Sequence, residues 1–131
     1  MKKLLNVCII DDDDIHLYTI KRALKEIAIP QEISTFSDGE EAINFIKDNS
    51  DNSDALPDLI LLDINMPIMD GFDFIEAFVE LKIKKDIIIH MVSSSVNPND
   101  IKRAKDIPQI TEYITKPISP KVLEQLIKNA A

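Results

Sequence analysis

The sequence predicts an α/β domain in which helices cover both faces of a five-stranded parallel sheet. Short apolar runs alternate with longer amphipathic stretches along the chain, which is the order of repeated strand–helix units. The clearest runs contain almost no polar residue, as is typical of strands that are buried on both faces. Connections between such strands are right-handed and place their helices against the sheet.

Five apolar runs are the expected strands. The first, third and fourth are the most apolar, and each ends abruptly at a polar residue, namely at Asp11, at Asp63 and at Ser93. An abrupt change of this kind separates a strand from the loop that follows it. The expected strands are residues 5–10, 32–36, 58–62, 87–92 and 112–115.

The stretches between the strands have the periodicity of amphipathic helices. In the first of them, Ile20 and Leu24 fall on one side, and charged residues fall mostly on the other. The last begins with Ser119-Pro120, which combines a capping side chain with a proline in the first turn. The expected helices are residues 15–28, 38–48, 72–81, 97–105 and 119–128.

Composition and charge limit the classes of function. The chain fits one compact domain, residues 1–131, and we expect no output domain after its fifth helix. The formal charge of −8 argues against direct binding of nucleic acid, which requires a basic patch. No stretch approaches the roughly 18 apolar residues of a membrane span, so we expect a cytoplasmic protein without membrane contact. Cys8 is the only cysteine, which excludes an internal disulfide, and its apolar neighbours indicate a buried strand thiol.

Polar residues with complementary chemistry lie at the carboxyl ends of the expected strands. In an open parallel sheet, the functional site lies outside this edge. Asp11 and Asp12 follow the first strand, Asp63 the third, Ser93 the fourth and Lys116 the fifth. Three carboxylates, one hydroxyl and one ammonium group are therefore expected to converge there.

The chemistry of these residues indicates a phosphoryl-transfer site. Asp11, Asp12 and Asp63 supply the hard oxygen ligands that Mg²⁺ or Mn²⁺ prefers. Asp63, on the central strand, can also attack a phosphoryl group and form an aspartyl phosphate. The cation, the Lys116 ammonium group and the Ser93 hydroxyl would then each contact one oxygen of the transferred group.

The segments around these residues resemble the receiver domains of two-component response regulators, of the single-domain, chemotaxis-regulator-like type. The resemblance covers residues 5–126, and the combination of D-x-x-M-P-x-M-D-G with a later K-P is highly specific. The matching segments are Ile9-Ile10-Asp11-Asp12, LLDINMPIMDG at residues 61–71, Met91-Val92-Ser93 and Tyr113-Ile114-Thr115-Lys116-Pro117.

The resemblance implies a flavodoxin-like fold of five strand–helix units with strand order 2-1-3-4-5. It also implies that Asp63 accepts a phosphoryl group from a sensor histidine kinase or a histidine phosphotransfer protein. Transfer would be self-catalysed and followed by slow autodephosphorylation, without enzymatic turnover. By the same match, Asp12, Asp63 and the backbone carbonyl of Asn65 would bind Mg²⁺ directly, and Asp11 would bind it through water.

Further matches concern regulation. Ser93 and Tyr113 match the switch pair of the family, in which the hydroxyl turns towards the phosphoryl group and the aromatic ring moves inward. Asn65 and Ser95 each lie two residues past a key residue, and the resemblance implies that they tune the phosphate lifetime by shaping water access. Output would reach a downstream protein target through the face formed by the fourth helix, the fifth strand and the fifth helix.

Two segments depart from the pattern of the family. Residues 105–111 lack the Gly-Ala pair that receivers often carry before the last strand, and the whole chain has two glycines. The geometry at the end of the fourth helix is therefore not predicted. Residues 48–57 are rich in Asp, Asn and Ser, and we expect them to form a long solvated loop.

Other polar residues near the site have simpler interpretations. Asp13 and Asp14 are expected at the N-terminus of the first helix, where negative charge is favoured. A calcium loop does not fit this acidic run, because its glycine and its closing glutamate are missing. His16 is expected to pack or to face solvent, and His90 to lie in the core or on a sheet face, and neither is expected to carry a phosphoryl group.

Two other functions remain as hypotheses. A phosphatase of the haloacid-dehalogenase type also forms an aspartyl phosphate, but it needs an acid/base Asp where this chain has Asn65, and a cap domain for which there is no room. A degenerate receiver would bind partners without phosphate, against which the complete set of acids argues. Repeated turnover of a phosphate ester would indicate the phosphatase. Absence of a Mg²⁺ effect on stability would indicate the degenerate receiver.

Overall fold

The computed structural model describes residues 4–131 and confirms the predicted fold class. Five parallel strands form one sheet in the order β2-β1-β3-β4-β5, and a helix follows each strand. Residues 1–3 of the predicted domain lie outside the described residues. The strands are β1 Leu5–Ile10, β2 Gln31–Phe36, β3 Leu59–Leu62, β4 Ile88–Ser93 and β5 Ile110–Thr115. The helices are α1 Asp14–Lys25, α2 Gly39–Asp48, α3 Gly71–Leu81, α4 Pro98–Lys105 and α5 Pro120–Ala130.

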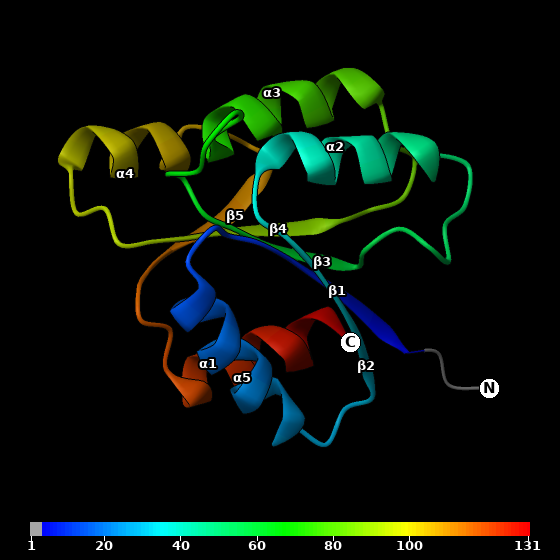
Figure 1. The fold of residues 1–131 in the computed structure, drawn as a ribbon, viewed down its shortest axis with the longest axis vertical. Coiled ribbons are helices and arrows are strands. Elements are labelled where there is room, and N and C mark those ends of the chain that lie inside the picture. The colour runs from blue at the N-terminus through cyan, green and yellow to red at the C-terminus, as the bar shows by residue number, and fades with distance from the viewer. Residues whose placement is uncertain (1–3) are drawn as a thin grey trace.

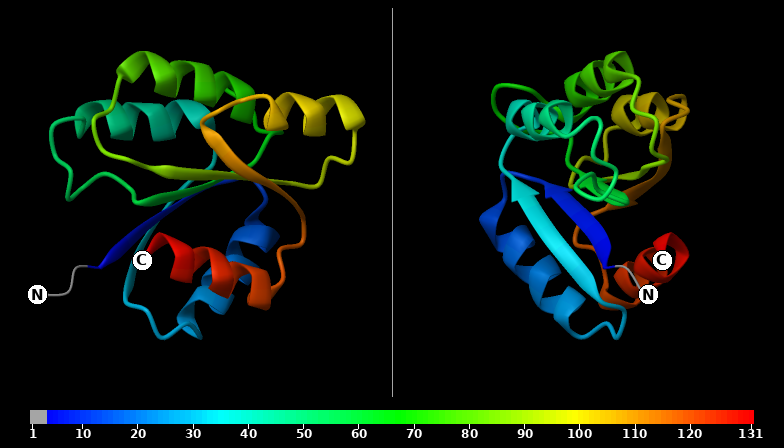
Figure 2. Two further views of the ribbon diagram at one scale, coloured as in Figure 1. Left: turned by 180° about the vertical axis from the view of Figure 1, so that it is seen from behind. Right: turned by 90° about the vertical axis from the view of Figure 1, so that its right-hand side faces the viewer.

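The helices form two layers, one on each face of the sheet. Figure 1 shows α2, α3 and α4 on one side and α1 and α5 on the other, and the views in Figure 2 show the same division. Neighbouring residues of one strand supply both cores: Ile9 packs in the cluster beneath α1 and α5, whereas Ile10 packs in the cluster beneath α2 and α3. Because side chains alternate between the faces of a sheet, a central strand must be apolar on both faces over most of its length.

Several element boundaries differ from those expected. α1 ends at Lys25 rather than at residue 28, because the N–H groups of Glu26 and Ile27 bond to carbonyls three residues back and close a tight last turn. Ser93 is the last residue of β4 rather than the first residue after it, and β5 begins at Ile110 rather than at residue 112. The β4–β5 pair is therefore longer than the apolar runs suggest.

The glycine-poor segment after α4 turns without glycine. The Ile110 N–H donates to the Ile107 carbonyl at 3.2 Å and leads the chain into β5. Pairing with β4 then shifts, since Ile89 pairs with Ile110 but His90 pairs with Glu112. One extra residue on β5 makes a β-bulge at this point, where the segment without the Gly-Ala pair enters the strand.

The loop between α2 and β3 is mostly exposed, as expected, but its last residues are held against the sheet. Leu56 is buried, and its carbonyl accepts hydrogen bonds from Asn6 Nδ2 at 3.2 Å and from Lys85 Nζ at 2.8 Å. Lys85 also pairs with the Asp58 carboxylate at 2.9 Å. Asp58 was expected to begin the strand, but β3 begins at Leu59 and Asp58 anchors the loop instead.

Two predictions about buried side chains are confirmed. Cys8 is buried in β1, and burial raises the pKa of its thiol to about 12, as befits an unreactive cysteine. His90 is buried in β4, and burial lowers its pKa, although the negative charge of Glu112 acts to raise it. Among residues 4–131, no helix has the length and apolar character needed to cross a membrane.

The loop between β3 and α3 approaches the end of β3 closely at Gly71. The Gly71 N–H donates to the Ile64 carbonyl at 2.8 Å, and a Cβ at this position would overlap the Asp63 carbonyl oxygen. The φ angle of Gly71 is not positive, so the close approach, rather than the backbone conformation, requires glycine. This contact fixes the backbone that follows β3.

Ile68, in the same loop, has a strained backbone that glycine would relieve. Its φ is 68°, and the Met69 N–H donates to the Pro67 carbonyl at 2.7 Å, which makes a γ-turn that β-branched residues rarely adopt. We expect Ile68→Gly to stabilise the protein by about 1 kcal/mol in urea denaturation, because relief of strain outweighs the greater flexibility of the unfolded chain.

Val96→Gly is the matched control for this substitution. Val96 is 72% exposed, against 75% for Ile68, and its φ is not positive. It should lose stability or stay unchanged, because glycine there only makes the unfolded chain more flexible. Equal effects of the two substitutions would show that the Ile68 turn stores no strain.

Candidate functional site

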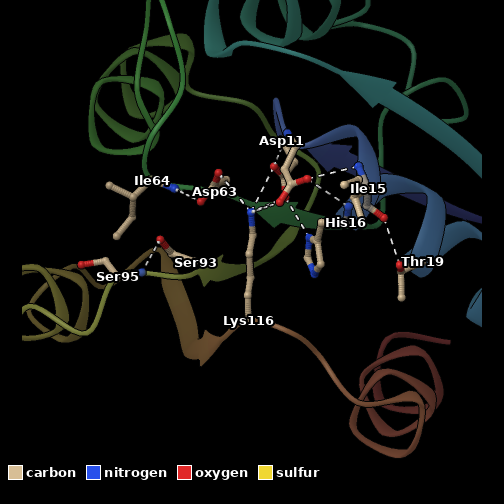
Figure 3. A network of polar contacts seen from close by, with 10 residues as sticks. Asp11, Ile15, His16, Thr19, Asp63, Ile64, Ser93, Ser95 and Lys116 are labelled. Carbon is tan, nitrogen blue, oxygen red and sulfur yellow. Dashed lines mark hydrogen bonds and ion pairs between the residues drawn. The ribbon is translucent and has the colours of Figure 1, made fainter.

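The ends of the strands bring the predicted polar residues to one edge of the sheet. Asp11 directly follows β1, Asp63 follows β3, Ser93 ends β4 and Lys116 follows β5. Figure 3 shows the Lys116 side chain extending towards the carboxylates of Asp11 and Asp63. Lys116 and Asp11 are 105 positions apart in the chain, and their side chains are in direct contact.

The Lys116 ammonium group lies between two buried carboxylates. Its Nζ is 3.0 Å from Asp11 Oδ2 and 3.3 Å from Asp63 Oδ2, and the backbone N–H of Lys116 donates to the Ser93 carbonyl at 2.9 Å. Burial alone would lower the pKa of Lys116, but the hydrogen bonds and charges of both aspartates outweigh burial and raise it. Lys116 is therefore a cation that both carboxylates share.

The two carboxylates differ in how well their charge is compensated. Burial would raise the pKa of Asp11, but hydrogen bonds from His16, the Asp13 N–H and Lys116 outweigh burial and lower it. For Asp63, burial and then the negative charge of Asp11 raise the pKa, and the contact with Lys116 does not offset them. Asp63 is therefore the anion that gains more from a further cation or from modification of its oxygen.

Asp12 completes an acidic group that suits a divalent cation. One carboxylate oxygen from each of Asp11, Asp12 and Asp63 lies within 4.8 Å of the other two. Asp12 is exposed whereas the other two are buried, so the group is open to solvent on the Asp12 side. The backbone carbonyl of exposed Asn65 accepts no hydrogen bond from residues 4–131. An oxygen-only donor set with this negative charge fits Mg²⁺ or Mn²⁺.

The hydroxyl residues beside this group are linked to α4 and β5. The Ser95 N–H donates to Ser93 Oγ at 3.2 Å, and Ser95 Oγ donates to Asp100 Oδ2 in α4 at 2.7 Å. The Tyr113 hydroxyl donates to the Ser95 carbonyl at 2.7 Å, and the ring is partly buried against the core. Ser95 thus connects the buried Ser93 with two elements of the expected output face.

The structure adds a residue that the sequence does not predict for the site. His16 Nδ1 lies 2.9 Å from Asp11 Oδ2, and the ring is buried beside Lys116 (Figure 3). The expected packing role agrees with this burial, but the contact with Asp11 was not expected. Asp13, predicted at the helix N-terminus, is the N-cap of α1 and accepts a hydrogen bond from the His16 N–H. The sequence did contain a signal for the contact between His16 and Asp11, because a polar side chain stands in the first turn of a helix that starts beside two acids.

Comparison with known sequences identifies the family of this chain. The family model of the response regulator receiver domain matches residues 7–128. The sensor histidine kinase CheAY of Helicobacter pylori is 34% identical over 95% of this chain, and the chain spans 15% of that relative's length.

Solved structures of response regulators have the same fold. A two-component response regulator from Cytophaga hutchinsonii has a TM-score of 0.85 at 28% identity, with 98% of each chain covered. The phosphorylated cyanobacterial phytochrome response regulator RcpA has a TM-score of 0.77 at 30% identity, with 96% of this chain and 90% of that chain covered. This chain therefore belongs to the family of response regulator receiver domains.

Proposed function

We propose that the chain accepts a phosphoryl group on Asp63 in a Mg²⁺-dependent reaction and thereby changes its contacts with a partner protein. The observation that carries the proposal is the ammonium group of Lys116, shared by the buried carboxylates of Asp11 and Asp63 at the edge of the sheet. The raised pKa of Asp63 marks it as the poorly compensated anion. The related regulator RcpA, solved in phosphorylated form, supports the same chemistry.

In the proposed reaction, one Asp63 oxygen attacks the phosphorus of a phosphohistidine. A P–O bond forms as the P–N bond breaks, and the electron pair of the P–N bond returns to the donor imidazole. Lys116 turns from the carboxylates to one phosphoryl oxygen, and the Ser93 hydroxyl donates to another. Mg²⁺ bound by Asp12, Asp63 and the Asn65 carbonyl, and by Asp11 through water, would neutralise charge on a third oxygen.

The proposed donor is a sensor histidine kinase or a histidine phosphotransfer protein. The Helicobacter pylori relative is a sensor histidine kinase, which supports phosphohistidine as the phosphoryl source. The formal charge of −8 does not favour contact with nucleic acid. We therefore propose a protein as the downstream target as well.

We also propose that Ser93 and Tyr113 form the switch. Ser95 is held at three points, through its N–H by Ser93, through its carbonyl by Tyr113 and through its hydroxyl by Asp100. A Ser93 hydroxyl that turns to the phosphoryl group would release the first of these contacts. The loop that carries Ser95 could then shift together with α4 and with the Tyr113 ring, which changes the face formed by α4, β5 and α5.

Replacement of the acceptor tests the proposed reaction. With acetyl phosphate and Mg²⁺, the parent protein should gain the mass of one phosphoryl group on the tryptic peptide that contains Asp63. Asp63→Asn should gain none, because an amide is not a nucleophile for phosphorus, and removal of Mg²⁺ or Asp12→Asn should reduce the gain severalfold. Asp51→Asn, an exposed carboxylate in the α2–β3 loop, is the matched control. Modification of Asp63→Asn to the extent of the parent would refute the proposal.

The raised pKa of Asp63 predicts that its charge costs stability. Below pH 3.8, the ordinary pKa of this group, the carboxyl group is protonated in both the folded and the unfolded protein, so it costs no stability. The loss of stability builds up as the pH rises from this value through the higher pKa of the folded protein. Without Mg²⁺, Asp63→Asn should therefore be more stable than the parent at pH 7, by on the order of 1 kcal/mol, and the difference should shrink towards pH 4. Urea denaturation across this range measures it, and a difference independent of pH would contradict the assignment.

Removal of the Ser93 hydroxyl tests the switch. In Ser93→Ala, the change of amide NMR shifts in α4 and β5 on addition of beryllofluoride and Mg²⁺ should be severalfold smaller than in the parent. The physical reason is that alanine neither contacts the phosphoryl analogue nor holds the Ser95 N–H. Ser94→Ala, which changes an exposed neighbouring serine, is the control and should respond as the parent does. Parent-like shifts in Ser93→Ala would exclude Ser93 as the switch.

A further inference from the structure

Two carboxylates of the β1–α1 turn hold His16, since Asp11 contacts its ring and Asp13 contacts its backbone N–H. Its ring is 6% exposed, and Nδ1 lies 2.9 Å from Asp11 Oδ2. Its backbone N–H donates to Asp13 Oδ1 at 3.2 Å, as part of the cap of α1. The contact with Asp13 fixes the backbone of His16 in the first turn of α1, and from this position the ring reaches Asp11.

The surroundings of the ring favour one tautomer. The Asp11 carboxylate, whose pKa is lowered, is an acceptor, so His16 Nδ1 must carry the hydrogen that joins them. Nε2 is buried and has no hydrogen-bond partner among residues 4–131. A hydrogen on Nε2 would be buried without an acceptor. The contact with Asp11 therefore requires a hydrogen on Nδ1, whereas no residue near Nε2 calls for one there.

Asp11 accepts hydrogen bonds from Lys116, from the His16 ring and from the backbone N–H of Asp13. Oδ1 accepts from the Asp13 N–H at 2.9 Å, and Oδ2 accepts from His16 at 2.9 Å, so each oxygen has a donor besides Lys116. Lys116 Nζ contacts both oxygens, at 3.2 Å and 3.0 Å, and is also shared with Asp63. In the proposed reaction, Lys116 turns to the phosphoryl group, and the donors from His16 and Asp13 remain on Asp11.

We propose that His16 is a positioning residue that keeps the Asp11 carboxylate in place when Lys116 moves to the phosphoryl group. This inference rests on the proposed function of Asp63. The hydrogen bond from Nδ1 fixes the direction of the Asp11 carboxylate, which a divalent cation would contact through water. Residues that orient a metal-binding carboxylate in this way commonly strengthen metal binding.

Substitutions at position 16 separate hydrogen bonding from packing. His16→Leu keeps a side chain of similar bulk but removes the donor, whereas His16→Asn places an amide N–H near the position of Nδ1. We expect His16→Leu to weaken Mg²⁺ binding about tenfold, the usual size of the effect for a residue that orients a ligand, when measured by isothermal titration. Binding of beryllofluoride in the presence of Mg²⁺ should weaken in parallel. His16→Asn should recover most of both affinities.

The second histidine of the chain provides the matched control. His90 is buried like His16 and also has a ring nitrogen, Nδ1, without a partner among the described residues, but it lies within β4. His90→Leu should therefore bind Mg²⁺ as the parent does. Parent-like Mg²⁺ affinity in His16→Leu, or equally weak binding in His16→Asn and His16→Leu, would overturn the inference.

A measurement on the parent protein does not depend on whether the variants fold. Two-bond ¹H–¹⁵N NMR correlations of the imidazole should show the hydrogen of His16 on Nδ1, and a hydrogen on Nε2 alone would overturn the inference. Failure of the proposed function would look different. In that case the parent itself would bind no Mg²⁺ and take no phosphoryl group on Asp63. If only the inference about His16 fails, the parent does both, and His16→Leu binds Mg²⁺ as the parent does.

Discussion

Two buried carboxylates that share one ammonium group are the constraint on which the rest of this structure depends. Asp11 is 3% exposed and Asp63 is 5% exposed, and Lys116 contacts both. Two like charges in a poorly hydrated pocket repel each other, and a single cation cannot compensate both. The hydrogen bonds of the pocket favour Asp11, so the remaining imbalance is concentrated on Asp63. An imbalance of this kind at one residue is typical of a functional site that trades stability for reactivity.

The sheet register brings the two acids together. Ile10 of β1 pairs with Leu62 of β3, and the Asp63 N–H donates to the Ile10 carbonyl at 2.9 Å, so both strands end at the same level. A shift of the register by one residue would turn every side chain of a strand to the opposite face. The shift is opposed by the close packing of these side chains in the two cores, and by the cost of drawing Asp11 or Asp63 into the buried part of the sheet. The packing that stabilises the fold is therefore also what sets the distance between the charges.

The helix α4 has few buried residues and is linked to the pocket by a hydrogen bond. Of the eight residues of α4, Ala104 alone is buried, so this helix is anchored to the core by little apolar surface. Its N-terminal turn is joined to the site through the hydrogen bond between Ser95 and Asp100. The proposed switch would need such a helix, because an element with few buried residues can shift at small cost when a polar contact at its end changes.

The sequence by itself determined where the five strands lie to within two residues, because a strand buried on both faces is mostly apolar, and the residues 5–10 predicted for β1 are those observed. It also determined which side chains end the strands, and hence the acids and the lysine of the site. Contacts between separate elements were decided by the tertiary structure. The bulge opposite His90 and the contacts of Lys116 with Asp11 and Asp63, which are 105 and 53 positions away in the chain, depend on packing across elements. Local periodicity indicates which face of an element is buried. The direction of a polar side chain such as Lys116 is set by hydrogen-bond and ion-pair partners that only the folded chain brings near.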